Sequence, residues 1–439
     1  MSDLTELRLA AQQIFGEALR AVDPAAAIRE KVRMQESQLV VCDREFELGP
    51  LMNVFGIAIG KASERMSYAI EEVFGDEFLT GVLSGPQPKF GWDYFAGGHP
   101  LPNEDSLAAA KAAIHLLEVA DHENSLIVFS ISGGGSAMFE LPINDEVTLA
   151  DLRSANEVLL SCGASIREIN AVRRAFSAVK GGRLAAFAPK SRQLTLIVSD
   201  VPNGEEHNVA SGPTWPPPAA APFAAEVVAR YKLEGLLPPS IMRAVANDAP
   251  ALSEMRDDRH HHFILLDNDT ALEAAANAAR VRGFVTEIAR DIADDAIEVG
   301  CQRLLARLAS LQRQHPDANV CLISGGEFSC PVRGDGVGGR NSETALRIAL
   351  AVDRDRERYK EFVALCVGTD GVDGSSFAAG AIADSTTIER MRKMCGEPSY
   401  FLDHSDSAAP FVLLKEAIET GATGTNVRDL RILLSGRRA

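Results

Sequence analysis

The sequence contains no run of lysines or arginines that would form a basic strip on a surface. Its 439 residues include 44 Lys and Arg against 61 Asp and Glu, which gives a formal net charge of −17. Nucleic acids and anionic membranes are bound through such a basic surface, so we expect neither as a partner. A small anionic substrate stays compatible with this charge, because only the residues that line its binding site matter.

The cysteines form no CxxC pair, the spacing typical of many metal and redox sites. Seven scattered cysteines indicate reduced, mostly buried thiols of a cytosolic protein rather than a disulfide framework. Residues 1–13, MSDLTELRLAAQQ, lack the apolar core of a signal peptide, and no apolar run approaches the ~18 residues of a membrane-spanning helix. We therefore expect a soluble, cytoplasmic protein.

Two catalytic patterns are also absent. No cluster of His and Cys suggests zinc, and no G-x-S-x-G motif with a suitable histidine suggests a serine hydrolase. Residues 260–262 are three consecutive histidines at the entrance of an expected strand. We interpret them as exposed loop, with a metal site as the alternative.

Strands that alternate with helices run through nearly the whole chain. With 439 residues, 46% of them hydrophobic, we expect two domains with cores of their own. The alternation predicts an α/β fold in which each domain is a largely parallel sheet flanked by helices, with an interdomain cleft. Proline-rich segments at 216–222 and 237–239 suggest a first domain over residues 1–240 and a second over 241–439. The last ~15 residues can pack back on the first domain. The expected strands are 53–59, 79–84, 126–131, 194–199, 262–267, 284–289, 319–324 and 362–367.

Two of these strands end in a glycine turn, in LIVFSISGGGS (126–136) and in NVCLISGGEF (319–328). Glycines permit positive φ and let backbone N–H groups approach a ligand closely. The carboxyl ends of strands in open α/β sheets are where phosphates and carboxylates bind. A plain tight turn explains one such motif, but two copies in separate halves favour an enzyme with phosphate-handling loops. The residues expected to bind substrate or phosphate at the first turn are Ser132, Gly133, Gly134, Gly135 and Ser136.

Lys61 follows a buried strand and begins a helix. Counted from Gly56, the spacing is one residue short of a P-loop, and Ala62 stands where that motif needs a Mg²⁺-binding Ser or Thr. We expect the Lys61 ammonium to bind phosphate at the carboxyl edge of the sheet. A solvated lysine in the first turn of the helix is the alternative.

A helix that contains Asn170 and continues to Lys180 carries a second group of candidates. Arg173, Ser177 and Lys180 share one stripe of this helix, next to an apolar stripe. Polar groups that border a buried stripe are expected to line a cleft, where two cations and a hydroxyl would bind a carboxylate or phosphate. Ordinary salt bridges on a surface helix are the alternative.

Carboxylates end or follow several expected strands. Asp200, Glu327 and Asp370 lie at these positions, and Asp373 lies in the loop after the last of them. Such acids are costly unless they meet a cation or a transferable proton. We expect these four carboxylates to hold Mg²⁺ together with substrate phosphates, and either Asp200 or Asp370 to act as the base.

The glycine-dense loop Gly334-x-Gly336-x-x-Gly339 matches the dinucleotide fingerprint and precedes a helix. Its context is poor, because the segment before it, residues 330–333, is charged and contains proline where a clean strand is needed. NAD(P) binding is therefore an alternative for this loop rather than the preferred interpretation.

Taken together, these motifs resemble the glycerate 2-kinase family, whose carboxyl-terminal half is called a MOFRL domain. The resemblance covers the chain nearly from end to end, in unchanged order. The similar stretches are IGKASERM (59–66), GGHPLPNEDS (97–106), ISGGGSA (131–137), INAVRRAFSAVKGGRLA (169–185), VSDVP…ASGPT (198–214), ISGGEF…GDGVGGRNSE (323–343), VGTDGVDGSS…AAGAIAD (367–384) and TGATGTNVRDL (420–430).

The resemblance implies ATP- and Mg²⁺-dependent phosphorylation of D-glycerate at its 2-hydroxyl, giving 2-phosphoglycerate, in a cleft between a Rossmann-like domain and a MOFRL-type domain. It also implies that Lys61, the first glycine turn and the helix with Arg173 and Lys180 hold phosphate, so that small-molecule substrate and nucleotide are the partners. Whether the protein is a homodimer stays open. The residues expected to be catalytic are Lys61, Arg173, Lys180, Asp200 and Asp370, and those expected near the nucleotide are Gly325, Gly326, Gly336, Gly338, Gly339, Arg340 and Asn341.

The sequence departs from the family pattern at several positions. Residues 203–207 read NGEEH where the family usually has GDDP, Phe377 replaces an aspartate, Ser342 a glutamine and Arg428 an asparagine. Two rival functions follow. One is an NAD(P)-dependent hydroxypyruvate reductase that uses the loop at 334–339. The other is a catalytically weak relative that binds a sugar acid or nucleotide.

Overall fold

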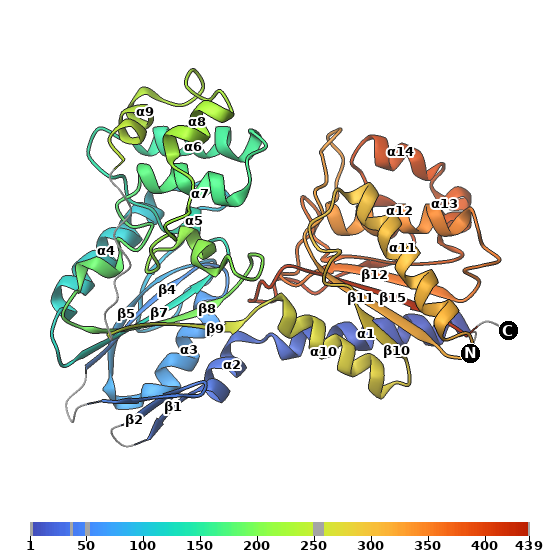
Figure 1. Ribbon diagram of the computed structural model, residues 1–439, viewed down its shortest axis with the longest axis horizontal. Coiled ribbons are helices and arrows are strands. Elements are labelled where there is room, and N and C mark those ends of the chain that lie inside the picture. Colours follow the sequence, from blue (N-terminus) through green and yellow to red (C-terminus); the bar gives the residue numbers. More distant parts are fainter. Residues whose placement is uncertain (1–2, 36–37, 49–52, 249–258, 438–439) are drawn as a thin grey trace. The chain divides into compact units, whose positions relative to one another are not determined.

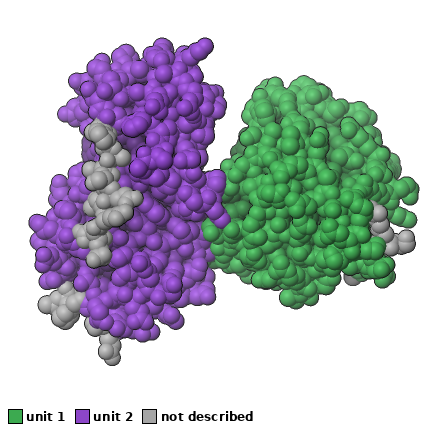
Figure 2. Space-filling view, viewed as in Figure 1, with its two compact units in different colours: residues 1–23, 267–439 green, residues 24–266 purple. Residues whose placement is uncertain are grey.

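The computed structural model describes residues 3–35, 38–48, 53–248 and 259–437 (Figure 1). The chain forms two compact units. Residues 1–23 and 267–439 make unit 1, and residues 24–266 make unit 2 (Figure 2). The chain thus begins in unit 1, builds the whole of unit 2 and then returns to unit 1.

This division differs from the predicted one at residue 240. The proline-rich segments lie within unit 2, where the first precedes helix α8 (Ala224–Arg230) and Pro239 occupies the first position of helix α9 (Pro239–Ala246). Proline suits that position because the N–H it lacks would have no helical partner there. The prolines therefore precede or begin helices within unit 2, and the boundary comes after the next strand, at residues 266 and 267.

Unit 2 is organised around a six-stranded sheet in the order β6-β5-β4-β7-β8-β9, with every neighbouring pair parallel. The predicted parallel sheet is confirmed for this half. Its central strand β7 is buried along its whole length, as expected where helices cover both faces of a parallel sheet. The strands are β4 (Asn53–Ile59), β5 (Phe78–Ser84), β6 (Asp93–Phe95), β7 (Ser125–Ser132), β8 (Arg192–Val198) and β9 (His260–Leu266).

The other elements of unit 2 are its helices and a small antiparallel sheet of β1 (Val32–Gln35), β2 (Gln38–Val41) and β3 (Arg44–Glu47). Besides α8 and α9, the helices are α2 (Pro24–Lys31), α3 (Ser63–Phe74), α4 (Glu104–Ala120), α5 (Gly135–Met138), α6 (Leu149–Ser161) and α7 (Ile166–Ala175). Three short 3₁₀ helices, η1 (Gly75–Glu77), η2 (Ala185–Phe187) and η3 (Glu206–Ser211), complete the unit.

Unit 1 contains a mixed sheet in the order β10-β11-β15-β12-β13-β14. Only β10 and β11 are parallel, so the prediction of a largely parallel sheet is wrong for this half. Two strands that the sequence did not indicate are the reason: β15 lies antiparallel between β11 and β12, and β13 is antiparallel to both of its neighbours. The residues expected to pack back on the first domain thus form a central strand of unit 1. The strands are β10 (Val285–Ile288), β11 (Val320–Gly326), β12 (Phe362–Gly368), β13 (Gly380–Asp384), β14 (Ala417–Ile418) and β15 (Asp429–Ser435).

Helices cover both faces of this sheet (Figure 1). Alternate residues of β12 point to opposite faces: Leu365 joins the core under α1 and α10, and Cys366 joins the core under α11 and α12. The amino-terminal helix α1 belongs to this unit because Ile14 and its apolar neighbours pack on the first of these faces. Arg8 of α1 also forms ion pairs with buried Asp384 (2.5 Å) and Glu416 (2.7 Å). The helices are α1 (Asp3–Ala21), α10 (Asn268–Val281), α11 (Ile297–Gln314), α12 (Arg340–Asp353), α13 (Thr387–Met394), α14 (Pro398–Asp403) and α15 (Ala408–Leu413).

None of the helices in the described ranges combines the length and the apolarity that crossing a bilayer requires. The predicted cleft between the two domains stays a prediction.

Candidate active site

The first candidate site lies at the carboxyl edge of the unit 2 sheet, where β4 and β7 are neighbours. Lys61 follows β4, and its backbone N–H donates to the carbonyl of Gly133 at 2.9 Å. The Ser132 hydroxyl donates to the carbonyl of Ile59 (3.2 Å) and accepts from the N–H of Ala62 (3.0 Å). Ser132 is fully buried, so its hydroxyl joins the two loops to each other.

Gly134 is the position of this turn that requires glycine. Its φ is +82°, and a Cβ placed on it would lie 3.0 Å from Cδ2 of His99 and 3.2 Å from Cγ of Lys61. A side chain at residue 134 would therefore meet both the Lys61 chain and the His99 ring, and glycine lets these two side chains lie against the turn. Sequence reasoning expected Lys61 at this edge and missed His99. In the same loop, Oδ1 of Asn103 accepts from the N–H of Ser106 at 2.9 Å and so caps α4.

A strained loop packs against the same turn. A Cβ on Gly135 would lie 2.7 Å from Cβ of Ala210, and both Ala210 and Ser211 have left-handed φ, +52° and +63°. Such strain persists only where surrounding contacts fix it, and it is concentrated at functional sites. The Ser211 hydroxyl lies 2.9 Å from that of Ser136 and donates to Oδ1 of Asn170 at 2.8 Å. The structure thus brings the predicted residues Ser136 and Asn170 together through Ser211.

The helix predicted to reach Lys180 ends earlier, because α7 stops at Ala175. Ser177 and Lys180 lie beyond it and both contact Glu140, a residue that the sequence analysis did not consider. Lys180 forms an ion pair with Glu140 in which each side chain is only 1% exposed, and the Ser177 hydroxyl donates to Oε1 of Glu140 at 2.5 Å. Burial lowers the pKa of Lys180, and the Glu140 carboxylate opposes this shift.

Arg173 is also buried and bound to the protein. Its Nε donates to Oδ1 of Asn156 at 2.8 Å, and burial lowers its pKa to about 10, although the charge of Glu140 acts in the opposite direction. The structure therefore supplies Arg173 and Lys180 with protein partners. Removing one member of a buried charged pair commonly costs about 3–5 kcal/mol, which makes these cations part of what holds the fold. Their contact with a substrate anion stays a prediction.

Asp200 lies two residues beyond β8 and is half-buried, at the same edge of the sheet as the turn after β7. The segment that departs from the family pattern follows it. Within that segment Glu205 accepts from Nδ2 of Asn208 at 2.8 Å, and the carbonyl of Asn208 accepts from Asn170 at 3.3 Å. The altered segment is therefore connected by hydrogen bonds to the residues around the glycine turn.

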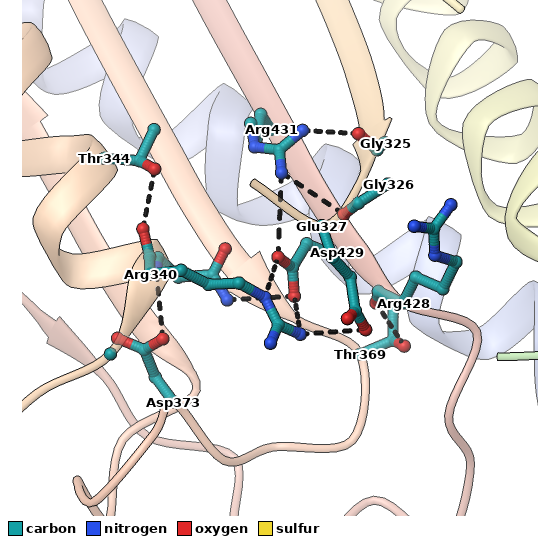
Figure 3. A network of polar contacts seen from close by, with 12 residues as sticks. Gly325, Gly326, Glu327, Arg340, Thr344, Thr369, Asp373, Arg428, Asp429 and Arg431 are labelled. Atoms are coloured by element: carbon teal, nitrogen blue, oxygen red, sulfur yellow. Dashed lines mark hydrogen bonds and ion pairs between the residues drawn. The ribbon is translucent and has the colours of Figure 1, made fainter. Parts of the chain in front are cut away.

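The second candidate site lies in unit 1, where the amino end of β15 meets the carboxyl ends of β11 and β12 (Figure 3). Asp429 is fully buried and accepts from Nε of Arg340 (2.6 Å), from Nη2 of Arg340 (3.0 Å) and from Nδ2 of Asn341 (3.0 Å). Arg340 also pairs with Glu327 at 2.9 Å. Burial alone would lower the pKa of Arg340, but the carboxylates of Asp429 and Glu327 outweigh it and raise that pKa.

The glycine turn of this unit is closed by two side chains. The side chain of Arg431 is 1% exposed and donates to the carbonyls of Gly325 and Gly326. Its Cζ lies 3.5 Å from the centre of the Phe328 ring, on which the guanidinium stacks. Asn268 accepts from the N–H of Gly326 at 3.0 Å, and a Cβ on Gly325 would lie 1.9 Å from its Oδ1. Both glycines are buried, so the polar atoms of this turn are used within the protein.

Three of the four predicted metal ligands, Glu327, Asp370 and Asp373, lie in unit 1. Asp373 is 1% exposed and accepts from the N–H of Asn341 (2.9 Å) and from the N–H (2.8 Å) and hydroxyl (2.6 Å) of Ser342, so it caps the start of α12. Burial raises the pKa of Asp373, although these hydrogen bonds act in the opposite direction. Asp370 is half-buried after β12 and accepts from the N–H of Val372 at 3.1 Å. Throughout the part of the chain that the structure describes, no three His, Cys, Asp or Glu side chains are grouped to hold a metal ion.

The glycine-dense loop at 334–339 lines a cavity of about 560 Å³ in unit 1, a size typical of small-molecule sites. Pro331 and Val332 contribute an apolar wall, and Arg340 and Glu343 contribute charge. A Cβ on Gly336 would lie 2.4 Å from Cβ of Asp406, so this glycine permits close packing as well as access. Cys330 also lines the cavity, and burial together with Glu343 raises the pKa of its thiol to about 12.

The other departures from the family pattern also have places in unit 1. Phe377 is 62% exposed, Ser342 is buried against Asp373, and Arg428 has a φ of +73° and pairs with Asp294. The left-handed conformation at Arg428 suits asparagine better than arginine. The ion pair with Asp294 holds its guanidinium at the edge of the network in Figure 3.

Comparisons with known proteins agree with this two-part organisation. Residues 10–246 match a family model described as a domain of unknown function (DUF4147), and residues 320–429 match the MOFRL family. The chain is 33% identical to the D-glycerate 2-kinase of Thermotoga maritima, over 98% of this chain and 99% of that one. It is 32% identical to the glycerate 2-kinase of Pyrococcus horikoshii, over 98% and 97%.

Two further comparisons bear on fold and function. The crystal structure of a glycerate kinase from Thermotoga maritima matches with a TM-score of 0.80 at 30% identity, over 98% of this chain and 100% of that one. A protein of Agrobacterium vitis named "Putative hydroxypyruvate reductase" is 35% identical, over 87% of this chain and 98% of its own length.

Proposed function

The chain belongs to the glycerate 2-kinase family, and we propose that it transfers the terminal phosphoryl group of ATP to the 2-hydroxyl of D-glycerate, releasing ADP and 2-phosphoglycerate. Membership of the family makes it a kinase that phosphorylates glycerate. The donor, the metal and the position of the new phosphate are the proposal. The observation that carries it is the open glycine turn beside Lys61 at the carboxyl edge of unit 2.

We assign the phosphoryl acceptor to unit 2. The backbone of Gly133 to Gly135 offers N–H groups to a carboxylate or to the transferred phosphoryl group, and Lys61 neutralises the charge that develops on it. Asp200 belongs to the same sheet edge and accepts the proton of the attacking hydroxyl. Arg173 and Lys180 support this edge through Asn156 and Glu140.

We assign the nucleotide to unit 1, with the cavity beside the loop at 336–339 as its site. Arg340 reaches this cavity and is held in place by Asp429 and Glu327, which suits a side chain that grips phosphate oxygens. The glycines at 325 and 326 have a supporting part here, because Arg431 and Asn268 occupy their polar atoms.

The carboxylates of this unit fit Mg²⁺ unequally. Asp370 fits, because a half-buried carboxylate after a strand can hold the ion together with nucleotide phosphates, which is how Mg²⁺ is usually bound in kinases. Asp373 does not fit, because the start of α12 uses both of its oxygens. When bound, Mg²⁺ would neutralise charge on the nucleotide phosphates. Transfer of this kind needs positioning and charge neutralisation rather than a covalent intermediate.

Phosphorus NMR of the products formed from ATP and D-glycerate tests the proposal. We expect one product resonance, that of 2-phosphoglycerate, together with ADP, and no reaction after EDTA removes divalent metal. A 3-phosphoglycerate resonance would overturn the assigned position, and full turnover in metal-free buffer would overturn the assigned metal.

A hydroxypyruvate reductase is the second candidate, and the observation that favours it is the name of the Agrobacterium vitis relative. The loop at 334–339 is anchored to residues 404–407 rather than following directly on a strand, so it lacks the strand–turn–helix setting of a dinucleotide site. Oxidation of NADH or NADPH on addition of hydroxypyruvate would establish this function; we expect none.

A further inference from the structure

His99 lies at the same sheet edge as Lys61 and the open glycine turn. It follows β6, in the loop that leads to α4. The position that a Cβ of Gly134 would take is 3.0 Å from Cδ2 and 3.4 Å from Nε2 of His99, and 3.2 Å from Cγ of Lys61. The imidazole ring and the lysine side chain therefore both lie against the backbone of the turn at Gly134.

The loop that carries His99 is fixed at several points. The N–H of Gly98 donates to the hydroxyl of Ser106 at 3.0 Å, and Nδ2 of Asn103 donates to the carbonyl of Ala96 at 2.9 Å. A Cβ on Gly97 would lie only 2.2 Å from the carbonyl oxygen of Met138, so the loop packs tightly on the end of α5. The backbone of His99 is thereby held in place, while the residue itself stays exposed.

An exposed side chain on a fixed loop is suited to binding a ligand, because little conformational entropy is lost when it makes a contact. Imidazole carries an N–H donor in its neutral form as well as in its charged form. A hydrogen bond to an ionised oxygen is about twice as strong as one between neutral groups. The position of His99 thus matches an anionic group held above Gly134.

We propose that His99 contacts the substrate, donating a ring N–H to the anionic group bound between Lys61 and the turn at Gly134. This inference rests on the proposed function, since it names a further residue of the acceptor site in unit 2. The bound group is an oxyanion, either the carboxylate of glycerate or the phosphoryl group in transfer.

Kinetics of three variants test the assignment. We expect His99→Ala to lower kcat/KM for D-glycerate by about ten- to a hundredfold, with the KM for ATP unchanged, as for loss of one hydrogen bond to a charged group. A raised KM for glycerate indicates the carboxylate, and a lowered kcat indicates the phosphoryl group. His99→Gln keeps an N–H donor and is expected to recover part of the loss. The matched control is His122→Ala, an exposed histidine at the opposite, amino-terminal edge of β7, which should behave as wild type.

A kcat/KM within twofold of wild type for His99→Ala would overturn the inference. Calorimetric titration with D-glycerate and with inorganic phosphate separates this failure from failure of the proposed function. If the wild type does not phosphorylate glycerate, the proposed function fails. In that case the inference is tested by binding alone. It requires that the wild type and His122→Ala bind one of the two anions, and that His99→Ala bind the same anion at least about tenfold more weakly. Equal binding by all three proteins, or no binding by the wild type, would overturn it.

Discussion

Both units place a Ser-Gly-Gly turn at the end of a buried strand, Ser132–Gly134 in unit 2 and Ser324–Gly326 in unit 1. In unit 2 the neighbouring strand is parallel, so the chain that borders the turn is the loop after β4, with Lys61. In unit 1 the neighbour is antiparallel β15, which brings Arg431 to the carbonyls of the turn. The same short motif thus lies beside Lys61 and His99 in unit 2, where we call it the open turn, and is closed by Arg431 and Asn268 in unit 1, because strand direction decides what lies beside it.

The largest effect is expected at the closed turn. Arg431→Met leaves the carbonyls of Gly325 and Gly326 buried without their donor, and should lower the free energy of unfolding by about 3–5 kcal/mol. Urea unfolding followed by circular dichroism measures this loss. Arg313→Met, at an exposed position of α11, is the control and should change stability by less than about 0.5 kcal/mol. Normal stability with lost turnover would show that the closed turn meets substrate after all.

At the open turn the expected loss is in rate. Lys61→Ala should reduce phosphorylation of glycerate by about 10²–10³-fold, since it removes a charge placed where negative charge develops. The melting temperature should stay near that of the wild type. Lys111→Ala, on the exposed side of α4, serves as the matched control in the same coupled assay for ADP. Activity above half of the wild-type value in Lys61→Ala would contradict the distinction between the two turns.

A buried histidine makes part of the stability of unit 2 sensitive to acid. His262 lies 3.2 Å from the carbonyl of Thr214 and stacks on Trp215, next to the strained loop that packs on the turn. Burial lowers the pKa of His262 to about 4, and the Thr214 carbonyl only partly opposes this. The folded value is below the unfolded value of about 6.5, so the stabilisation is complete above pH 6.5 and is lost as pH falls towards 4.

We expect this loss to be about 1–3 kcal/mol. Scanning calorimetry between pH 7.5 and pH 4.5 measures it. His262→Gln cannot acquire charge and should flatten the profile, whereas His122→Ala should follow the wild type. Identical profiles for the wild type and His262→Gln would remove His262 as the cause.

The smallest effects are expected for the serines that begin the two turns. Ser132 joins two loops, and the hydroxyl of Ser324 donates to the carbonyl of Ile292. Ser132→Ala and Ser324→Ala should each cost about 1 kcal/mol of stability and leave kcat within about twofold. A selective loss of turnover in Ser132→Ala would instead place this hydroxyl on the substrate.

Much of unit 2 could be predicted from sequence because its strands and helices alternate with the expected periods, and a parallel sheet follows from that order alone. The sheet of unit 1 could not, because β15 follows a long stretch without clear alternation, and Arg431 interrupts its apolar run. Its pairing with β11 joins residues more than a hundred apart along the chain, and its pairing with β12 joins residues more than sixty apart. Local sequence patterns carry no information on such long-range pairing.

The candidate site shows the same limit. Lys61 was predictable, since it directly follows a buried strand. Glu140 and His99 were not, because each lies between expected strands and helices, where an ordinary loop residue is the usual interpretation. The ion pair of Lys180 with Glu140 gives that lysine a partner which no spacing along the chain indicates. The spacing of Arg173 and Lys180 therefore predicted that these cations are buried beside polar groups, but it did not predict which groups they contact.

The place of β15 also has a consequence for the order in which the protein is made. Residues 24–266 are synthesised as one uninterrupted stretch, so unit 2 can fold while the ribosome is still adding unit 1. Helix α1 is translated before unit 2, yet the sheet on which it packs lacks a central strand until residues 429–435 emerge. Until then its apolar face and the unpaired edges of β11 and β12 are exposed to other chains. We therefore expect a ribosome-bound or truncated chain that stops before residue 429 to aggregate through unit 1 while unit 2 is already protected from protease.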